Sequence, residues 1–270
     1  MHRFYLPPPG KDKGPPCPEP SRREEAGAAP GHGQAEALFL TGREAHHAVD
    51  VLRLRRGDTV RVLDGAGQER LCLVGAADRH RVSLSVLEKR SLPPPPCRVT
   101  LLQAIPKGRL FEAIVQKATE LGAWRIVPLL SQRVVVRLDP QEAVRRAEKW
   151  QWAAIAAIKQ CGAAWLPRVE RPLTPAQFLA RQEPCELSLL ASLQPGSRHP
   201  RECFRAFQAA HGRNPQTLCV WIGPEGDFTP EETEAIQAAG ALPVSLGPLV
   251  LRTETAATYC LSVVDYELRA

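Results

Sequence analysis

The stretch CVWIGPEGDFTPEE, residues 219–232, indicates the fold of the C-terminal part of the chain. An apolar run ends at Ile222, and the Gly-Pro-Glu-Gly turn after it predicts the end of a buried strand. A helix should begin next, because Thr229 and Glu232 have capping-box spacing and Pro230 takes the first helical position. Open α/β sheets bind ligands at the carboxyl ends of their strands, so this turn is either a ligand-binding loop or merely a tight strand-to-helix connection.

A second loop of the same kind lies in SLGPLVLRTETAA, residues 245–257. A short strand again ends at Gly-Pro, and a loop with Arg252, Thr253 and Glu254 leads into a final helix over about 254–268. Two such loops are expected to line one crevice. Alternatively, Arg252 and Glu254 form a surface ion pair worth less than about 1 kcal/mol.

The residues around these loops alternate between strand and helix patterns, which predicts a parallel α/β sheet. Strands are expected at residues 99–105, 125–130, 187–191, 217–222 and 243–246. A helix is expected over 109–121, where apolar residues share one face and Gly122 follows, and a longer one from Asp139-Pro140 to about Cys161.

The N-terminal third has a β pattern instead. Residues 59–64, 70–76 and 80–87 alternate apolar and polar side chains, with a turn at Asp64–Gly67, and short strands are expected at 3–6 and 37–40. Together with a short helix in 44–54, this predicts a small β-barrel.

The predicted domains are 1–90 and 98–270, joined by a proline-rich linker at 91–97. Residues 7–35, rich in Pro, Gly, Ala and charge, predict a flexible insertion.

Composition narrows the classes of protein. The net charge of +6 favours an anionic partner such as nucleic acid. The eight cysteines form no C-x-x-C pair, so reduced thiols are expected and no metal site. No signal peptide or apolar run of membrane-spanning length occurs, which predicts a cytoplasmic protein without membrane contact. No Rossmann or P-loop glycine motif is present.

IGPEG (222–226) followed by LGPLVLRTETAA (246–257) resembles the signature of the SPOUT methyltransferases, most closely the RsmE-type 16S rRNA uracil-N3 methyltransferases. Further stretches agree in order and spacing over nearly the whole chain outside 7–35, namely MHRFY (1–5), HHAVDVLRLRRGD (46–58), 107–133 and 159–169. The resemblance implies a PUA-like RNA-binding β-barrel, followed by an α/β domain with a C-terminal trefoil knot. It also implies S-adenosyl-L-methionine in the knot loops, 16S rRNA or the small ribosomal subunit as substrate, and a homodimer.

The resemblance also assigns roles to residues. It implies that the cofactor loops contain Ala191, Ile222, Gly223, Pro224, Glu225, Gly226, Leu246, Gly247, Pro248, Val250, Leu251, Thr253 and Ala256. Candidate RNA contacts are Arg3, His47, Arg53, Lys107, Arg109 and Arg133. Uridine N3 becomes nucleophilic when it loses its proton, so we hypothesise that Arg252 stabilises the developing uracil anion and that Glu254, a weaker candidate, acts as base or orienter.

Some residues depart from the family pattern. The usual Glu-Gln-(Ser/Cys)-Gly-Arg stretch of the family appears here as Lys159-Gln160-Cys161-Gly162-Ala163. Asp227 stands where the family usually has a second glycine after GPEG. Two alternatives therefore stay open: a methyltransferase for a different rRNA or tRNA nucleotide, and a non-catalytic RNA-binding ribosome-assembly protein.

Overall fold

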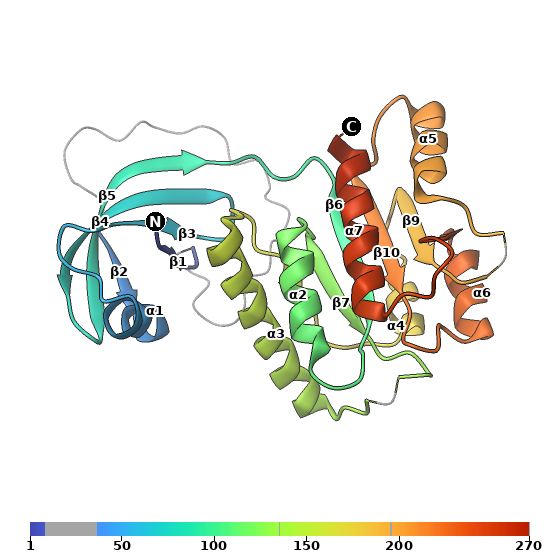
Figure 1. Cartoon of the computed structure of the whole chain (residues 1–270), viewed down its shortest axis with the longest axis horizontal. Helices are drawn as coiled ribbons and strands as arrows, with labels where there is room; N and C mark the ends of the chain where they lie inside the picture. Colours follow the sequence, from blue (N-terminus) through green and yellow to red (C-terminus); the bar gives the residue numbers. More distant parts are fainter. Residues whose placement is uncertain (9–36, 135, 195, 270) are drawn as a thin grey trace. The chain divides into compact units, whose positions relative to one another are not determined.

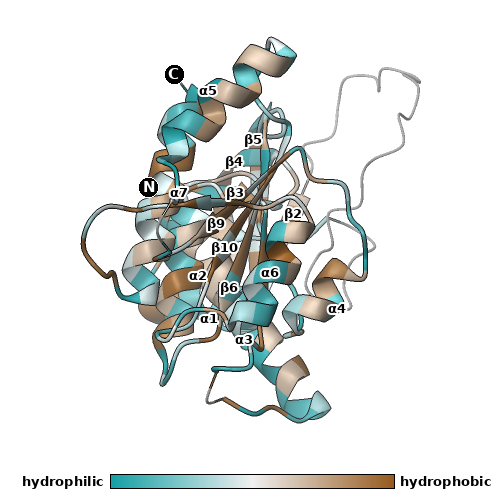
Figure 2. Cartoon of the chain, turned by 90° about the vertical axis from the view of Figure 1, so that its right-hand side faces the viewer, coloured by the Kyte–Doolittle hydropathy of each residue, from teal (hydrophilic) through white to brown (hydrophobic). Residues whose placement is uncertain are grey.

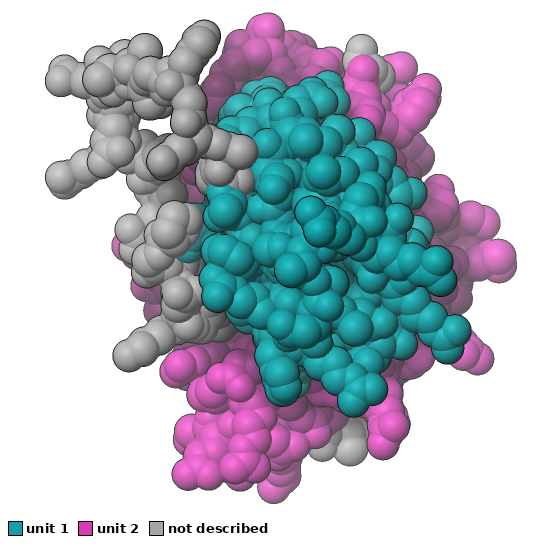
Figure 3. Space-filling view, turned by 90° about the vertical axis from the view of Figure 1, so that its left-hand side faces the viewer, with its two compact units in different colours: residues 1–94, 158–166 teal, residues 95–157, 167–270 magenta. Residues whose placement is uncertain are grey.

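The computed structural model describes residues 1–8, 37–134, 136–194 and 196–269. They divide into two compact units, coloured separately in Figure 3. The first unit is Met1–Pro94 with Ile158–Leu166, and the second is Pro95–Ala157 with Pro167–Ala270. The predicted insertion at 7–35 lies outside the described residues, apart from its first two positions.

The first unit contains a curled five-stranded sheet, as the alternating pattern predicts (Figure 1). The strand order is β1-β3-β4-β5-β2, with β1 parallel to β3 and the other neighbours antiparallel. The strands are β1 (Arg3–Tyr5), β2 (Ala37–Thr41), β3 (Thr59–Leu63), β4 (Gln68–Ala77) and β5 (Arg81–Ser91). The predicted helix in 44–54 is α1 (Gly42–His46), continued by the π-helical turn η1 (His47–Val51).

The core of this unit consists of the inward-facing residues of each strand. Phe4, Val60, Val62 and Leu40 are completely buried. Their alternation with exposed positions is the two-residue period of a sheet with one covered face.

Residues 158–166 belong to the first unit, although the sequence pattern had placed them in the C-terminal domain. Their backbone binds the β3–β4 turn, where Gly67 N donates to Ala164 O (3.1 Å) and Leu166 N donates to Gly65 O (3.0 Å). A Cβ on Gly67 would lie 2.6 Å from the Trp165 ring, so this close approach requires glycine.

Lys159, which departs from the pattern of the family that the sequence resembles, forms an ion pair within this unit. Lys159 Nζ lies 2.7 Å from Glu44 Oε1, and both side chains are mostly buried, at 16% and 14% exposed. Arg3 Nη1 donates to the carbonyls of Lys159 (3.3 Å) and Gln160 (2.8 Å), near the end of helix α3 (Pro140–Cys161). The lysine therefore forms an ion pair, and Arg3 binds carbonyls at the helix end.

The second unit contains the predicted parallel α/β sheet, with strand order β11-β9-β10-β6-β7-β8. Its strands are β6 (Arg98–Ala104), β7 (Arg125–Leu129), β8 (Arg168–Val169), β9 (Leu187–Ala191), β10 (Thr217–Ile222) and β11 (Leu242–Val244). Besides α3, its helices are α2 (Leu110–Glu120), α4 (Pro175–Leu179), α5 (Pro200–His211), α6 (Pro230–Ala238) and α7 (Thr253–Arg269). The sequence pattern did not predict β8, α4 or α5, and β11 ends two residues earlier than predicted.

Helices cover both faces of this sheet, as the near-continuous apolar strands require. Figures 1 and 2 show α2 and α7 on one face and α4 and α6 on the other, with the apolar strands β6, β9 and β10 between them. On the α4/α6 face, Phe178 packs edge-on against Trp221, with ring centroids 5.4 Å apart. Because helices cover both faces of the sheet, the loops that connect strands and helices meet at the ends of the strands.

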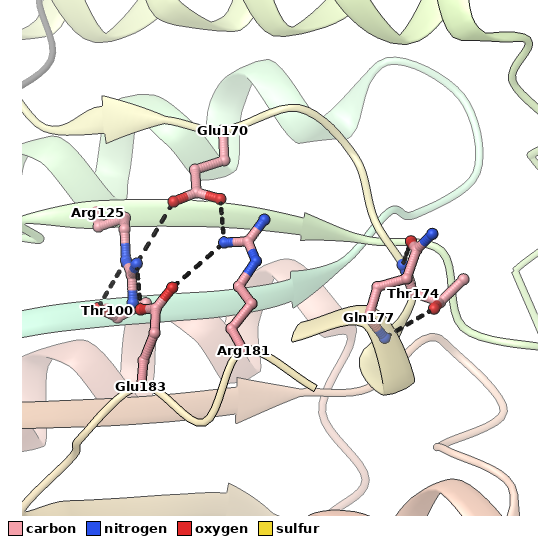
Figure 4. A network of polar contacts seen from close by, with 7 residues as sticks. All are labelled: Thr100, Arg125, Glu170, Thr174, Gln177, Arg181 and Glu183. Carbon is pink, nitrogen blue, oxygen red and sulfur yellow. Dashed lines mark hydrogen bonds and ion pairs between the residues drawn. The ribbon is translucent and has the colours of Figure 1, made fainter. Parts of the chain in front are cut away.

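A polar network crosses the amino end of this sheet (Figure 4). Arg125, the first residue of β7, contacts Glu183 at 2.6 Å, Glu170 at 3.4 Å and the Thr100 hydroxyl at 3.2 Å. Arg181 also binds Glu170, at 2.8 Å. Glu170 is only 7% exposed, so its two arginine partners compensate the burial of its charge. We interpret this end of the sheet as structural.

Within the described residues, no helix is both long and apolar enough to cross a membrane, and none of the seven cysteines forms a disulfide.

The Glu44–Lys159 pair generates a stability prediction. Replacing Lys159 by Met should lower the free energy of unfolding by about 2 kcal/mol, because it leaves a mostly buried carboxylate without its cation. Urea denaturation of the full chain measures the change. The matched control is Lys159→Met combined with Glu44→Gln, which removes both charges and should recover most of the loss. An equal loss in the single and double variants would contradict this role of the pair.

Candidate functional site

Three loops meet at the carboxyl ends of the neighbouring strands β11, β9 and β10 and enclose a cavity of about 260 Å³. This volume is somewhat below the roughly 300–1,000 Å³ typical of small-molecule sites. The lining residues are Ala191, Ser192, Leu193 and Gln194 after β9, Ile222, Gly223, Pro224, Glu225 and Asp227 after β10, and Ser245, Leu246, Gly247, Pro248, Leu249, Val250, Leu251, Thr253 and Ala256 after β11. Parallel pairing thus builds one site from segments that lie far apart in the sequence.

The charges on the cavity wall have one sign. Glu225 and Asp227 are carboxylates, and no lysine, arginine or histidine is among the lining residues. A ligand with net positive charge is therefore favoured over an anionic one.

One wall of the cavity is apolar. It comes from the loop after β11, in which Leu249 and Val250 are 74% and 76% exposed. Large aliphatic side chains with so little cover suit contact with a ligand or another macromolecule. The cavity therefore combines an apolar side with an acidic side.

Glu232 fixes the loop after β10. The Glu232 carboxylate is 9% exposed and accepts from the Ser131 hydroxyl (2.8 Å) and from the backbone N–H groups of Gln132 (2.9 Å) and Thr229 (3.1 Å). Arg133 Nη1 donates to the Gly226 and Phe228 carbonyls of the same loop. The segment after β7 thus holds the cavity loop by both side-chain and backbone bonds.

Asp227, the second departure from the family pattern, has a backbone conformation that favours glycine. Its φ is 61°, in the left-handed region, where Asp is tolerated better than most residues. Its Oδ1 accepts from Phe228 N at 2.8 Å. The substitution therefore preserves the turn and adds a carboxylate to the cavity wall.

The structure gathers all the predicted cofactor residues around this cavity except Gly226, whose carbonyl binds Arg133. The two predicted catalytic residues, Arg252 and Glu254, do not line it. They flank Thr253, which does, and the Arg252 side chain is exposed. Sequence reasoning missed six lining residues, namely Ser192, Leu193, Gln194, Asp227, Ser245 and Leu249. Their positions next to predicted loop residues were the available signal.

The predicted RNA contacts of the first unit lie around α1 and the end of α3. His47 Nδ1 is 3.5 Å from Lys159 Nζ, and burial, followed by the charge of Lys159, lowers the pKa of His47. His47 is therefore a neutral hydrogen-bonding group at pH 7 rather than a cation. Arg53 is exposed and has φ of 53°, which is uncommon for a side chain of its size.

Two of the three predicted RNA contacts of the second unit, Lys107 and Arg133, contact the cavity loop after β10. Lys107 and Arg109 are exposed on the segment between β6 and α2, and Lys107 N donates to Glu225 Oε1 (3.2 Å). Arg133 binds the loop after β10. None of the three lines the acidic cavity, but the Lys107 backbone and the Arg133 guanidinium contact the loop after β10 that forms part of its wall.

Comparison with known proteins points to one activity. Residues 93–265 match the model of the RNA methyltransferase domain, and residues 40–87 match that of the RNA methyltransferase PUA domain. The chain is 32% identical to the ribosomal RNA small subunit methyltransferase E of Bacillus subtilis, over 87% of this chain and 91% of the relative. It is 35% identical to the Synechocystis protein of that name, over 84% of this chain and 72% of the relative.

Two solved structures similar to this one contain S-adenosylmethionine. A Legionella pneumophila protein in complex with this cofactor has a TM-score of 0.80 and 28% identity, over 98% of this chain and 97% of that one. The ribosomal RNA small subunit methyltransferase E of Neisseria gonorrhoeae, also bound to the cofactor, has a TM-score of 0.77 and 25% identity, over the same shares.

The left-handed conformation at Asp227 generates a prediction. Asp227→Gly should change the free energy of unfolding by less than about 1 kcal/mol, because glycine tolerates this φ although it loses the Phe228 bond. Asp227→Val should lower it by about 2 kcal/mol, because a β-branched side chain is strained there. Thermal unfolding of both variants measures the difference. Equal effects of glycine and valine would contradict a backbone role for this position.

Proposed function

Since this chain belongs to the RNA methyltransferase family, with a match over residues 93–265, we propose that it methylates N3 of a specific uridine in 16S ribosomal RNA, with S-adenosyl-L-methionine as methyl donor. The single observation that carries the proposal is the cavity formed by the loops after β9, β10 and β11. The names of the relatives from Bacillus subtilis and Synechocystis support a small-subunit rRNA substrate. The reaction would take place in the cytoplasm, where small subunits are found.

The cavity suits this cofactor in charge and in the character of its lining residues. S-adenosylmethionine has a sulfonium, an ammonium and a carboxylate, hence a net positive charge, and Glu225 and Asp227 provide the opposite sign. The apolar residues Leu246, Pro248 and Leu251 suit the flat adenine ring. Gly223 and Gly247 allow the backbone to approach a ligand closely. We assign the loops around these residues, with the trefoil knot that the family resemblance implies, to the cofactor.

When bound, S-adenosylmethionine supplies an electrophilic methyl group on its sulfonium sulfur. The protein must hold uridine N3 in line with that group and promote loss of the N3 proton. As the proton leaves, negative charge spreads over N3, O2 and O4. A fixed cation beside this charge lowers the barrier, because it is attracted more strongly to the transition state than to neutral uracil.

Arg252 is suited to provide that cation. It precedes Thr253 at the first residue of α7, so it lies at the edge of the cavity without lining it, and its side chain is exposed. A cation in this place can reach a base presented to the cavity from outside. Glu254 is the remaining acidic group of this motif, and we assign it a secondary role in orienting the base or accepting its proton.

We assign the basic residues outside the cavity to the RNA. Lys107 and Arg133 contact the loop after β10, and Arg109 is exposed two residues after Lys107, so all three suit phosphates that flank the target nucleotide. In the first unit, Arg53 suits a phosphate contact, and so do the guanidinium N–H groups of Arg3 other than those of Nη1, which binds the α3 carbonyls. The neutral His47 suits a hydrogen bond to a base or to a ribose hydroxyl instead.

We also propose that the chain forms a homodimer. Tyr259 and Tyr266 are seven positions apart on α7 and are 44% and 62% exposed, and the apolar Leu249 and Val250 are still more exposed. Two aromatic residues on one helix face suit burial against a second copy.

The function is tested by incubating the protein with small ribosomal subunits from a strain that lacks it and with S-adenosylmethionine labelled in its methyl group. Nucleoside analysis should then find one labelled 3-methyluridine per subunit. A different labelled nucleoside would refute the uridine N3 target and favour the alternative rRNA or tRNA substrate. Absence of both methyl transfer and cofactor binding would favour the non-catalytic RNA-binding alternative.

The role of Arg252 has its own test. Arg252→Ala should lower kcat by about 100-fold or more, the range found when a charge-stabilising donor is removed from an active site. The Kd for S-adenosylmethionine and the unfolding temperature should change little, because the side chain neither lines the cavity nor is buried. Arg252→Lys is the matched control and should retain part of the rate. Near-normal turnover by Arg252→Ala would rule out this assignment.

A further inference from the structure

We propose that Gln103 and Thr253 are positioning residues, which hold two of the cavity loops together through a hydrogen-bonded chain that ends on the carbonyl of Gly223. The inference rests on the proposed function, because it concerns the same cavity. It assigns a role to a residue of the central sheet, Gln103, that does not line the cavity.

The chain of bonds runs from the sheet to the cavity. Gln103 lies in β6 and is completely buried. Its Nε2 donates to Thr253 Oγ1 at 2.8 Å and to the Ala104 carbonyl at 2.9 Å. Thr253 Oγ1 in turn donates to the Gly223 carbonyl at 2.8 Å. Both line the cavity, Gly223 on the loop after β10 and Thr253 at the first residue of α7, directly after the loop that follows β11.

The direction of every proton in this chain is fixed. Carbonyl oxygens only accept, so the amide atom that faces Ala104 must be the nitrogen. The same nitrogen then faces Thr253, whose oxygen accepts and whose proton remains for Gly223. A chain with accepting groups at both ends therefore has only one arrangement of its protons.

This arrangement commits the only proton of the Thr253 hydroxyl. The family resemblance implies that Thr253 contacts the cofactor, but its hydroxyl cannot donate to a ligand while it donates to Gly223. We therefore assign the hydroxyl to the protein and leave the remaining atoms of Thr253 to the cavity wall.

The bond from Thr253 to Gly223 is also isolated. Within the described residues, it is the only hydrogen bond that joins the loop after β10 (223–229) to the segment from 245 to 256. Glu232 and Arg133 hold the loop after β10 from its other side, through the segment after β7. The spacing between the two cavity loops therefore depends on Thr253.

Stability alone does not explain a glutamine at this place. Gln103 Oε1 is buried without a hydrogen-bond partner, which costs free energy that an apolar side chain would avoid. Its neighbours in the strand, Leu101, Leu102 and Ala104, are apolar and equally buried. A polar residue in the middle of a sheet is consistent with a specific role for its amide nitrogen. The hydrogen bond to Thr253 indicates that this role is to position Thr253.

The test compares Thr253→Val, Thr253→Ser and Gln103→Leu in the full chain. Valine keeps the shape of threonine but removes the hydroxyl, whereas serine keeps the hydroxyl. We expect the Kd for S-adenosylmethionine, measured by calorimetry, to rise about tenfold in Thr253→Val and Gln103→Leu, since misplaced loops bind the cofactor less well. Thr253→Ser should restore binding to within about twofold of the wild type.

A second measurement does not depend on the cofactor. Hydrogen exchange of the backbone amides at 225–228 in the ligand-free protein should be faster in Thr253→Val and Gln103→Leu and unchanged in Thr253→Ser. Amides of the β3–β4 sheet in the first unit are the internal reference. If the wild-type protein does not bind S-adenosylmethionine but the three variants show this exchange pattern, the proposed function is refuted and the positioning role is kept. Variants with unchanged Kd and unchanged exchange, whatever their unfolding temperature, would refute the positioning role.

Discussion

Parallel pairing of β11, β9 and β10 is the constraint on which the site depends. Neighbouring parallel strands end at the same edge of a sheet, so the loops after residues 191, 222 and 244 have to meet there. No single loop contains the cavity, and each contributes a different part of the wall. The acidic part comes from the loop after β10, and the apolar part from the loop after β11.

The two ends of this sheet differ in chemistry. At the amino end, Arg125, Glu170, Arg181 and Glu183 satisfy one another, and Glu170 is buried within that network. At the carboxyl end, Glu225 and Asp227 line an open cavity without a basic residue among the lining residues. The charges at the amino end are paired with one another, whereas the carboxylates at the carboxyl end have no basic residue beside them in the cavity wall. This difference favours the carboxyl end as the ligand-binding end of the sheet.

The sequence predicted the features that local patterns control. Gly-Pro turns after apolar runs predicted where β10 ends and where the cavity loops begin, and the capping box at Thr229 and Glu232 predicted the start of α6. It could not predict contacts between distant segments. The bonds from Glu232 to Ser131 and from Gln103 to Thr253 join residues 101 and 150 positions apart, and neither pair has a local signature. Lys159 appeared as a loss of the family glutamate, whereas its pairing with Glu44 became visible only in three dimensions.

The central claim is that the three strand-end loops form a site for S-adenosylmethionine, and its most direct test is a binding measurement on the full chain. Equilibrium dialysis with the labelled cofactor should reach saturation at one molecule per chain, and S-adenosylhomocysteine should displace it, since both share the adenosine and amino-acid parts. Absence of saturable binding, or binding that S-adenosylhomocysteine does not displace, would contradict the assignment of this cavity.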